Sequence, residues 1–163
     1  MKPLPANQLN PRIKHVWRIN DCIWITAIAL AGFAVLIPLS LATDMAPAAV
    51  MMLIAFGVVY IVALVVWLMV LPPIRYVRWR YEISDDYLDI AKGIIWRKRY
   101  TIPFIRVQNT DTRQGPIMRA FGLATVTVST AATEHAIPGL AFETAEELRD
   151  KAAELARLAR EDV

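Results

Sequence analysis

The apolar residues of this chain are concentrated in two long, uncharged runs. The first run, from Cys22 to Leu41, reads CIWITAIALAGFAVLIPLSL. About 20 helical residues at roughly 1.5 Å each match a hydrocarbon core about 30 Å thick. The second run, from Ala46 to Leu71, has about 26 residues and can cross a bilayer with tilt. The pattern predicts two membrane-spanning helices, the second of which should stop at Pro72 and Pro73.

The connection between the two runs is short. Only residues 42–45 separate them, so the helices should form an antiparallel hairpin. Asp44 is a suitable N-cap for the second helix, and Pro47 is tolerated in its first turn because a proline there removes no needed donor. Pro38 predicts a bend near the end of the first helix, since it leaves the carbonyl of Ala34 without a partner.

Basic residues flank the hairpin on its outer sides, whereas residues 42–45 contain an aspartate and no base. The positive-inside rule then makes the chain a multi-pass protein of the cytoplasmic (inner) membrane with both termini in the cytoplasm. A cleaved signal peptide fits poorly, because its apolar core would be shorter and would precede a small-x-small cleavage site. The flanking bases are Arg12, Lys14, Arg18, Arg75, Arg78 and Arg80.

The segment ahead of the first helix is amphipathic. Between residues 10 and 19, helical spacing places Ile13, Val16 and Trp17 on one face and the bases elsewhere. We expect this segment to lie at the membrane interface, with Trp17 at the headgroup level. Residues 1–9 carry prolines and little apolar content, and we expect a mobile tail there.

After the prolines the apolar pattern changes to the two-residue period of strands. Val77, Trp79, Tyr81 and Ile83 share one face of a predicted strand, and the turn residues 84–86 follow it. A second strand, antiparallel to the first, should end near the next turn residues, Lys92 and Gly93. Further short strands are predicted at Tyr100–Ile102, Ile105–Thr110, Ala124–Thr130 and His135–Ile137.

The chain closes with a helical pattern. Thr144 and Glu147 form a capping box, and Leu148, Ala152, Leu155 and Ala159 recur at helical spacing. A meander of antiparallel strands closed by one helix suits a small barrel or bent sheet of the pleckstrin-homology (PH) type. The predicted fold class is thus a membrane helical hairpin plus an α+β cytoplasmic domain. Its expected parts are a tail and interfacial segment (1–21), the hairpin (22–71, with spans 22–41 and 46–71) and the PH-like domain (74–163).

Composition and motifs exclude several functional classes. A net charge of +3 is too small to favour nucleic acid, and the single cysteine, Cys22, excludes an internal disulfide and a multi-cysteine metal site. No metal or cofactor motif occurs. His135 and Glu134 are neighbours on a strand and point to opposite faces, so they do not form a catalytic pair. We therefore expect no enzymatic activity, and the uncharged spans argue against a transporter.

Several strings resemble the bacterial PH-like membrane proteins of the YdbS-like group. They are NPRIKHVWRI from Asn10, RYEISDDYLDIAKGI from Arg80, IPFIRVQNTDTRQGPIMRAFGLATVTVST from Ile102 and IPGL from Ile137. The resemblance covers nearly the whole chain, from Asn10 to about Arg157. It implies a PH-like fold attached to the membrane, and it implies no particular activity, because a fold hosts many functions.

A cluster of basic residues is the best functional lead. Bases near a cytoplasmic leaflet gain about 1 kcal/mol each from anionic lipid. In phosphoinositide-binding PH domains, bases line the loop between the first two strands, whereas that loop is expected here at the acidic residues 84–86. This argues against such a headgroup pocket and leaves a diffuse contact or a protein partner. The candidate lipid- or partner-binding residues are Arg75, Arg78, Arg80, Arg97, Lys98 and Arg99.

Two functional hypotheses follow. The first is a non-catalytic scaffold or accessory subunit that binds another membrane protein or a second copy of itself, through the strand edges that a partly open barrel offers. The second is a module of the membrane surface that responds to anionic lipid through the basic cluster. Apart from the lipid bilayer, the sequence identifies no partner.

Overall fold

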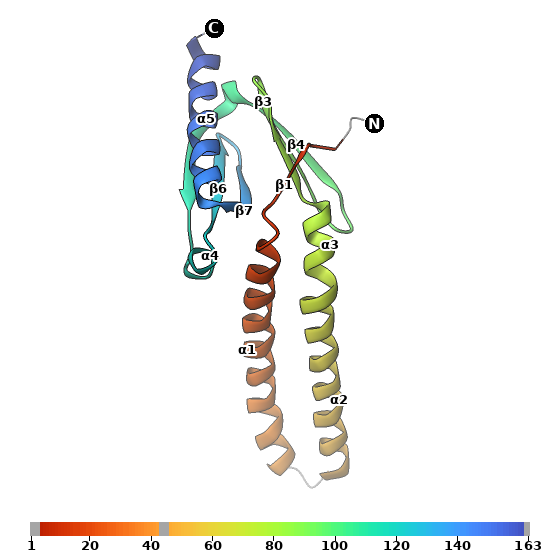
Figure 1. Ribbon diagram of the computed structural model, residues 1–163. Coiled ribbons are helices and arrows are strands. Elements are labelled where there is room, and N and C mark those ends of the chain that lie inside the picture. Colours follow the sequence, from red (N-terminus) through yellow and green to blue (C-terminus); the bar gives the residue numbers. More distant parts are fainter. Residues whose placement is uncertain (1–3, 43–45, 162–163) are drawn as a thin grey trace. The chain divides into compact units, whose positions relative to one another are not determined.

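The computed structural model describes residues 4–42 and 46–161 (Figure 1). The chain forms two compact units. One combines Met1–Val16 with Ile74–Val163, and the other is Trp17–Pro73. The predicted helix cap at Asp44 lies outside the described residues.

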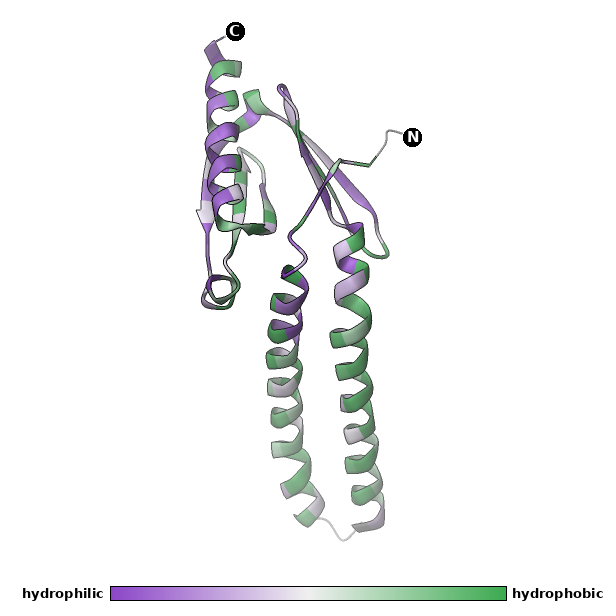
Figure 2. Ribbon diagram, viewed as in Figure 1, coloured by the Kyte–Doolittle hydropathy of each residue, from purple (hydrophilic) through white to green (hydrophobic). Residues whose placement is uncertain are grey.

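Two long apolar helices make up the membrane part. α1 (Ile13–Ala42) continues through Pro38, and α2 (Ala46–Val65) leads into a π-helical turn, η1 (Val66–Val70). Most residues of both helices are apolar (Figure 2), and many of their large apolar side chains are exposed. Both are long and apolar enough to cross a membrane. Apolar surface of this extent is unfavourable in water and suits the interior of a bilayer.

The helix does not stop at the two prolines, which corrects the prediction from the sequence. α3 (Leu71–Arg78) follows η1 without a break and contains both Pro72 and Pro73. The N–H of Leu71 donates to the carbonyl of Val66, which is the i to i+5 pattern of a π turn. A wider turn ahead of the prolines gives their rings room, so the chain stays helical to Arg78.

The two helices of the hairpin pack closely at one glycine. A Cβ atom added at Gly32 would lie 2.4 Å from Cζ of Phe56, so a larger residue there would require that ring to shift. Phe56 also meets the ring of Phe33 edge-on, with 4.9 Å between centroids. The hydroxyls of Thr26 and Tyr60 lie 3.3 Å apart and add a polar contact between α1 and α2.

The N-terminal segment belongs to the PH-like domain, which corrects two predictions. Residues 7 and 8 form strand β1 (Asn7–Gln8), and Leu9 is buried, so the described part of residues 1–9 is not a mobile tail. Ile13 is 0% exposed and packs against Gly139. The first turn of α1 therefore buries its apolar face in protein and not at a lipid interface.

The first sheet contains four antiparallel strands in the order β1-β2-β3-β4. The other three strands are β2 (Arg80–Ile83), β3 (Tyr87–Lys92) and β4 (Lys98–Pro103). β2 begins later than the predicted strand, because Val77 and Arg78 are the end of α3. β1 precedes α1 in the chain and pairs with β2, so the helical hairpin is inserted between the first two strands of this sheet.

This insertion corrects the interpretation of the acidic turn. Residues 84–86 join the second strand to the third, and not the first to the second. Their acidity therefore says nothing about the loop that carries bases in phosphoinositide-binding PH domains, and that argument against a headgroup site no longer holds.

The second sheet contains three antiparallel strands in the order β5-β6-β7. They are β5 (Val107–Arg113), β6 (Leu123–Thr130) and β7 (Glu134–Ala141). A 3-10 turn, η2 (Phe104–Arg106), leads into β5, and a short helix, α4 (Pro116–Ala120), joins β5 to β6.

The C-terminal helix covers the second sheet. α5 (Phe142–Glu161) packs on β5, β6 and β7 (Figure 1) and buries Ala145, Leu148, Ala152 and Ala156. The strands form two separate sheets that do not close into a barrel, so the barrel alternative is not observed. The predicted PH-like arrangement of antiparallel strands followed by one helix is confirmed.

Candidate functional site

Basic side chains lie on the outer face of the first sheet. The strand register places Arg80, Ala91 and Arg99 side by side on β2, β3 and β4. Side chains alternate between faces along a strand, so this row lies opposite the neighbouring core row that contains Tyr81 and Ile90. The outer row thus brings together two bases that are distant in sequence.

A pocket of about 750 Å³ lies over this row, and we call it the outer-face pocket. Besides Arg80, Ala91 and Arg99, the pocket is lined by apolar side chains and by residues at the end of α3. Six of its lining residues are bases, and none of its lining residues is acidic. The lining residues are Leu4, Val77, Arg78, Arg80, Ala91, Lys92, Gly93, Arg97, Lys98, Arg99 and Thr101.

The structure therefore brings together five of the six bases singled out in the sequence. Arg75 is exposed on α3 and is not part of the pocket lining. Lys92, which was not among the predicted residues, lines the pocket, and its Nζ lies 5.3 Å from the centroid of the Tyr100 ring. Its position at the end of a predicted strand, next to a turn glycine, was the available signal.

One of these bases is already neutralised. Asp89 is 2% exposed, and Nε of Arg99 donates to both of its carboxylate oxygens at 3.1 and 2.9 Å. This hydrogen bond is the main cause that raises the pKa of Arg99. Because the pair offsets its own charge, Arg99 shapes the pocket wall more than it attracts an anion.

Arg80 is in the opposite situation. Its Nε is buried and has no hydrogen-bond partner. Leaving a buried donor unpaired costs about 1–3 kcal/mol, so such groups usually have a partner. Arg78, Arg97 and Lys98 also form no ion pair with any part of the chain that the structure describes. The charge of these bases is available to a ligand.

An exposed apolar tip stands beside the pocket. The loop between β3 and β4 exposes Ile95 at 85% and Trp96 at 81%. Gly93 fixes the shape of this loop, since its φ is +116° and an added Cβ would lie 1.9 Å from the carbonyl oxygen of Trp96. Neither apolar residue was among the site residues predicted from the sequence. Three apolar residues, 94–96, between a turn glycine and a run of three bases were the signal, because loop tips are usually polar.

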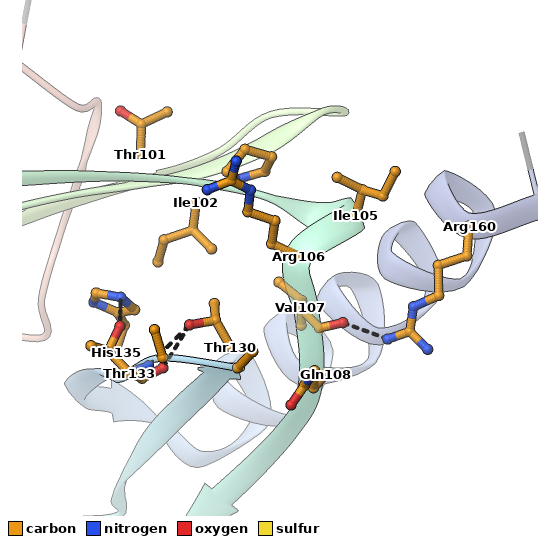
Figure 3. A pocket seen from close by; sticks show the side chains of 13 residues that line it. Thr101, Ile102, Ile105, Arg106, Val107, Gln108, Thr130, Thr133, His135 and Arg160 are labelled. Atoms are coloured by element: carbon orange, nitrogen blue, oxygen red, sulfur yellow. Dashed lines mark hydrogen bonds between the residues drawn. The ribbon is translucent and has the colours of Figure 1, made fainter. Parts of the chain in front are cut away.

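A second pocket, of about 670 Å³, lies where β4 leads into β5, beside the turn between β6 and β7 (Figure 3). Nε2 of His135 lies 2.9 Å from the hydroxyl of Thr133, and Arg160 donates to the carbonyl of Val107. Partial burial, and then the charge of Lys92, lower the pKa of His135. Thr133 and His135 resemble a nucleophile and a base, yet none of the residues that line this pocket is a carboxylate that could orient the imidazole.

A metal centre is not apparent either. Within residues 4–42 and 46–161, no group of three or more His, Cys, Asp or Glu side chains could hold a metal ion.

Comparison with known proteins agrees with this architecture. The sequence model of the family described as "Bacterial PH domain" matches residues 18–156, a range that begins inside α1 and so includes both apolar helices. The chain is 36% identical over 163 residues to the UPF0699 transmembrane protein YdbS of Bacillus subtilis (strain 168), and the match covers 100% of both chains.

A second relative is larger. The UPF0699 transmembrane protein YdbT of the same organism is 26% identical over 99 residues, which are 58% of this chain and 20% of that protein. No solved structure matches the chain. Because the family model covers most of the chain and a transmembrane relative matches along its whole length, this membrane protein belongs to the bacterial PH domain family.

Proposed function

We propose that this chain is a non-catalytic, membrane-anchored PH module that contacts the anionic leaflet of its own membrane through the β3–β4 hairpin. The observation that carries the proposal is the exposed pair Ile95 and Trp96 beside the basic outer-face pocket. An apolar tip with bases around it is the composition of membrane-surface segments, which combine burial of apolar groups with attraction to anionic lipid.

Electrostatic attraction to the leaflet acts over a longer distance than apolar contact does. Each base near an anionic surface contributes about 1 kcal/mol, and the effect extends over about one Debye length, roughly 8–10 Å. Arg78, Arg97 and Lys98 are exposed and form no ion pair among the described residues. Three such bases would supply about 3 kcal/mol to a contact that the two helices already keep close to the membrane.

The apolar tip adds the insertion step. An indole at the headgroup level keeps its ring among apolar groups and its N–H near water, which is why tryptophan is common at membrane interfaces. Trp96 and Ile95 point away from the core of the domain. Their insertion would remove a costly exposed apolar surface from water.

The proposed topology places these bases on the cytoplasmic side of the membrane. Bases lie on both outer flanks of the helical hairpin, and residues 42–45 contain none. We propose on this basis that both helices cross the cytoplasmic membrane and that both termini and the PH-like domain are cytoplasmic. In that topology the β3–β4 hairpin is on the side of the membrane whose leaflet carries anionic lipid.

A second candidate function is a scaffold or accessory subunit that binds another membrane protein or a second copy of this chain. The observation in its favour is the open arrangement of the sheets, in which β1, β4, β5 and β7 are edge strands. An edge strand can pair with a strand of a partner. If the full-length protein purifies in mild detergent as a monomer without any co-purifying protein, this candidate is disfavoured.

A fluorescent probe at the hairpin tip tests the lipid contact. The full-length protein carries Ile95→Cys in a Cys22→Ala background, labelled with an environment-sensitive dye. It is reconstituted in nanodiscs of phosphatidylcholine, with and without phosphatidylglycerol. We expect a blue shift in the anionic nanodiscs that salt reduces. The matched control carries the dye at Asp86, an exposed residue at the other end of β3, and should not respond. Equal spectra at both positions would contradict the proposal.

A further inference from the structure

We infer that the outer-face pocket is a specific site for the phosphate group of an anionic glycerophospholipid, with Arg80 as its central donor. The inference rests on the proposed contact with the leaflet and adds a defined ligand and stoichiometry to it. A diffuse basic surface would need no particular arginine, whereas a site needs donors that are held in place and are free to bind.

Arg80 meets both conditions. Its backbone is fixed in the centre of the sheet, between Gln8 of β1 and Ala91 of β3. Its Nε is buried without a partner, and the side chain lines the pocket. A phosphate oxygen is a strong acceptor that arginine binds through two parallel hydrogen bonds, so a phosphate in the pocket would satisfy this donor.

The neighbouring residues leave room for the ligand. Ala91 stands between Arg80 and Arg99 in the cross-strand row, and its single methyl group leaves space above the sheet. Asp89 holds Arg99 through both carboxylate oxygens, so the guanidinium of Arg99 is kept to one side of that space. Arg78 and Lys98 contribute further positive charge from α3 and β4.

The apolar part of the lining points to a lipid and not to a free phosphate. Leu4, Val77 and Ala91 line the same pocket as the bases, and Leu4 is itself 71% exposed. A glycerophospholipid presents a phosphate next to a glycerol and acyl esters, which matches a pocket with both basic and apolar walls. Inorganic phosphate would use only the basic part.

Chain connectivity also favours a membrane source. Arg78 follows Leu71, where the apolar run ends, by seven positions of α3, which is about 10 Å of helix. A soluble phosphoprotein is not held near this pocket by the chain. The leaflet in which the hairpin is anchored is present at very high local concentration.

Titration with a soluble lipid tests the site. The full-length protein in detergent is titrated calorimetrically with dioctanoyl phosphatidic acid, with inorganic phosphate and with a phosphoserine peptide. We expect saturable binding of one phosphatidic acid per chain and much weaker binding of the other two. Inorganic phosphate or the phosphopeptide binding as tightly as the lipid would overturn the assignment.

Charge-matched variants locate the site. Arg80→Gln should weaken phosphatidic acid binding about tenfold or more, as the loss of a charge-assisted pair predicts. Arg106→Gln removes the same charge from an exposed residue of η2 and should leave binding unchanged within about twofold. Arg78→Gln, on the exposed end of α3, provides a second pocket variant in case Arg80→Gln does not fold. Equal effects of Arg106→Gln and both pocket variants would overturn the site.

The two proposals can fail separately. If the dye at residue 95 responds to anionic nanodiscs but no lipid binds saturably, the leaflet contact stands and the specific site is wrong. If the dye does not respond and no lipid binds, both are wrong.

Discussion

Nε of Arg18 donates a hydrogen bond of 2.9 Å to the carbonyl oxygen of Leu68, fifty positions along the chain. Leu68 is the residue whose α-helical partner (i+4) is Pro72 and whose π-helical partner (i+5) is Pro73. Neither proline has an N–H, so the helix backbone cannot satisfy this carbonyl in either form. Arg18 of α1 supplies the missing donor, and the helix continues through both prolines.

This relationship predicts a specific rescue. Arg18→Leu should destabilise the protein by about 1–3 kcal/mol, because it leaves the carbonyl of Leu68 without a partner. Pro72→Ala restores an N–H four residues after Leu68, so the double variant should regain much of the loss. Thermal unfolding of the full-length protein in detergent measures the double-mutant cycle. Strictly additive effects of the two substitutions would show that Arg18 does not act through this carbonyl.

Alanine substitutions at three glycines of the PH-like domain distinguish the cost of backbone strain from the cost of close packing. Gly139 has φ +67°, and an added Cβ would lie 2.5 Å from Cγ1 of Ile13. Gly122 has φ +65° with nothing within 4 Å, and Gly115 has φ −74° with nothing within 4 Å. Gly115→Ala should therefore be nearly neutral, and Gly122→Ala should cost about 1–2 kcal/mol.

Gly139→Ala should be the most harmful of the three, at about 2–5 kcal/mol, because it adds overpacking against Ile13 to the same backbone strain. The order of the three unfolding midpoints in detergent is the measurement. If Gly139→Ala were no worse than Gly122→Ala, the first turn of α1 would not be packed in the domain core.

The sequence identified what depends on local composition. The two apolar runs and the helical spacing of Leu148, Ala152 and Leu155 carry their own signals, and each became a helix. The predicted capping box is wrong, because α5 begins at Phe142 and Thr144 lies inside its first turn. β1 gave no such signal, since it has two residues and pairs with Tyr81 and Arg80, more than seventy positions away. A strand this short is defined by its partner and not by its own propensity.

The continuous helix through Pro72 and Pro73 was missed for a related reason. Two adjacent prolines usually end a helix because their missing donors leave carbonyls unpaired. The donor that prevents this here comes from Arg18, far away in the sequence. The candidate site was also only partly predictable. Its bases could be identified in the sequence, whereas the unpaired Nε of Arg80 and the exposure of Trp96 became visible only in the structure.

His135 predicts a pH dependence of stability. Its pKa in the folded domain is lowered, first by partial burial and then by the charge of Lys92. The unfolded chain then binds the proton more readily than the folded one, so the contribution of His135 is fully present above the ordinary histidine pKa of about 6.5 and is lost as the pH falls below it. The unfolding midpoint should fall less between pH 7.5 and pH 5.5 in His135→Gln than in the original protein. An identical fall in both would contradict this role.

The proposed topology is tested by cysteine accessibility in a Cys22→Ala background. A cysteine at Asp44 should react with a membrane-impermeant thiol reagent added to intact cells. A cysteine at Ala132, an exposed residue of the turn between β6 and β7, should react only after lysis. Labelling of position 132 in intact cells would place the PH-like domain outside the cytoplasm and remove the cytoplasmic leaflet as its target.

The contact of the β3–β4 hairpin with lipid can be measured in living cells by photo-crosslinking. A benzophenone amino acid replaces Trp96 in the full-length protein, and the same residue at Asp86 serves as the control. After irradiation, the purified protein is analysed by mass spectrometry. We expect the chain with the probe at position 96 to gain the mass of a phospholipid and the chain with the probe at position 86 not to gain it. Crosslinks at position 96 to protein alone would contradict the lipid contact and support the scaffold instead.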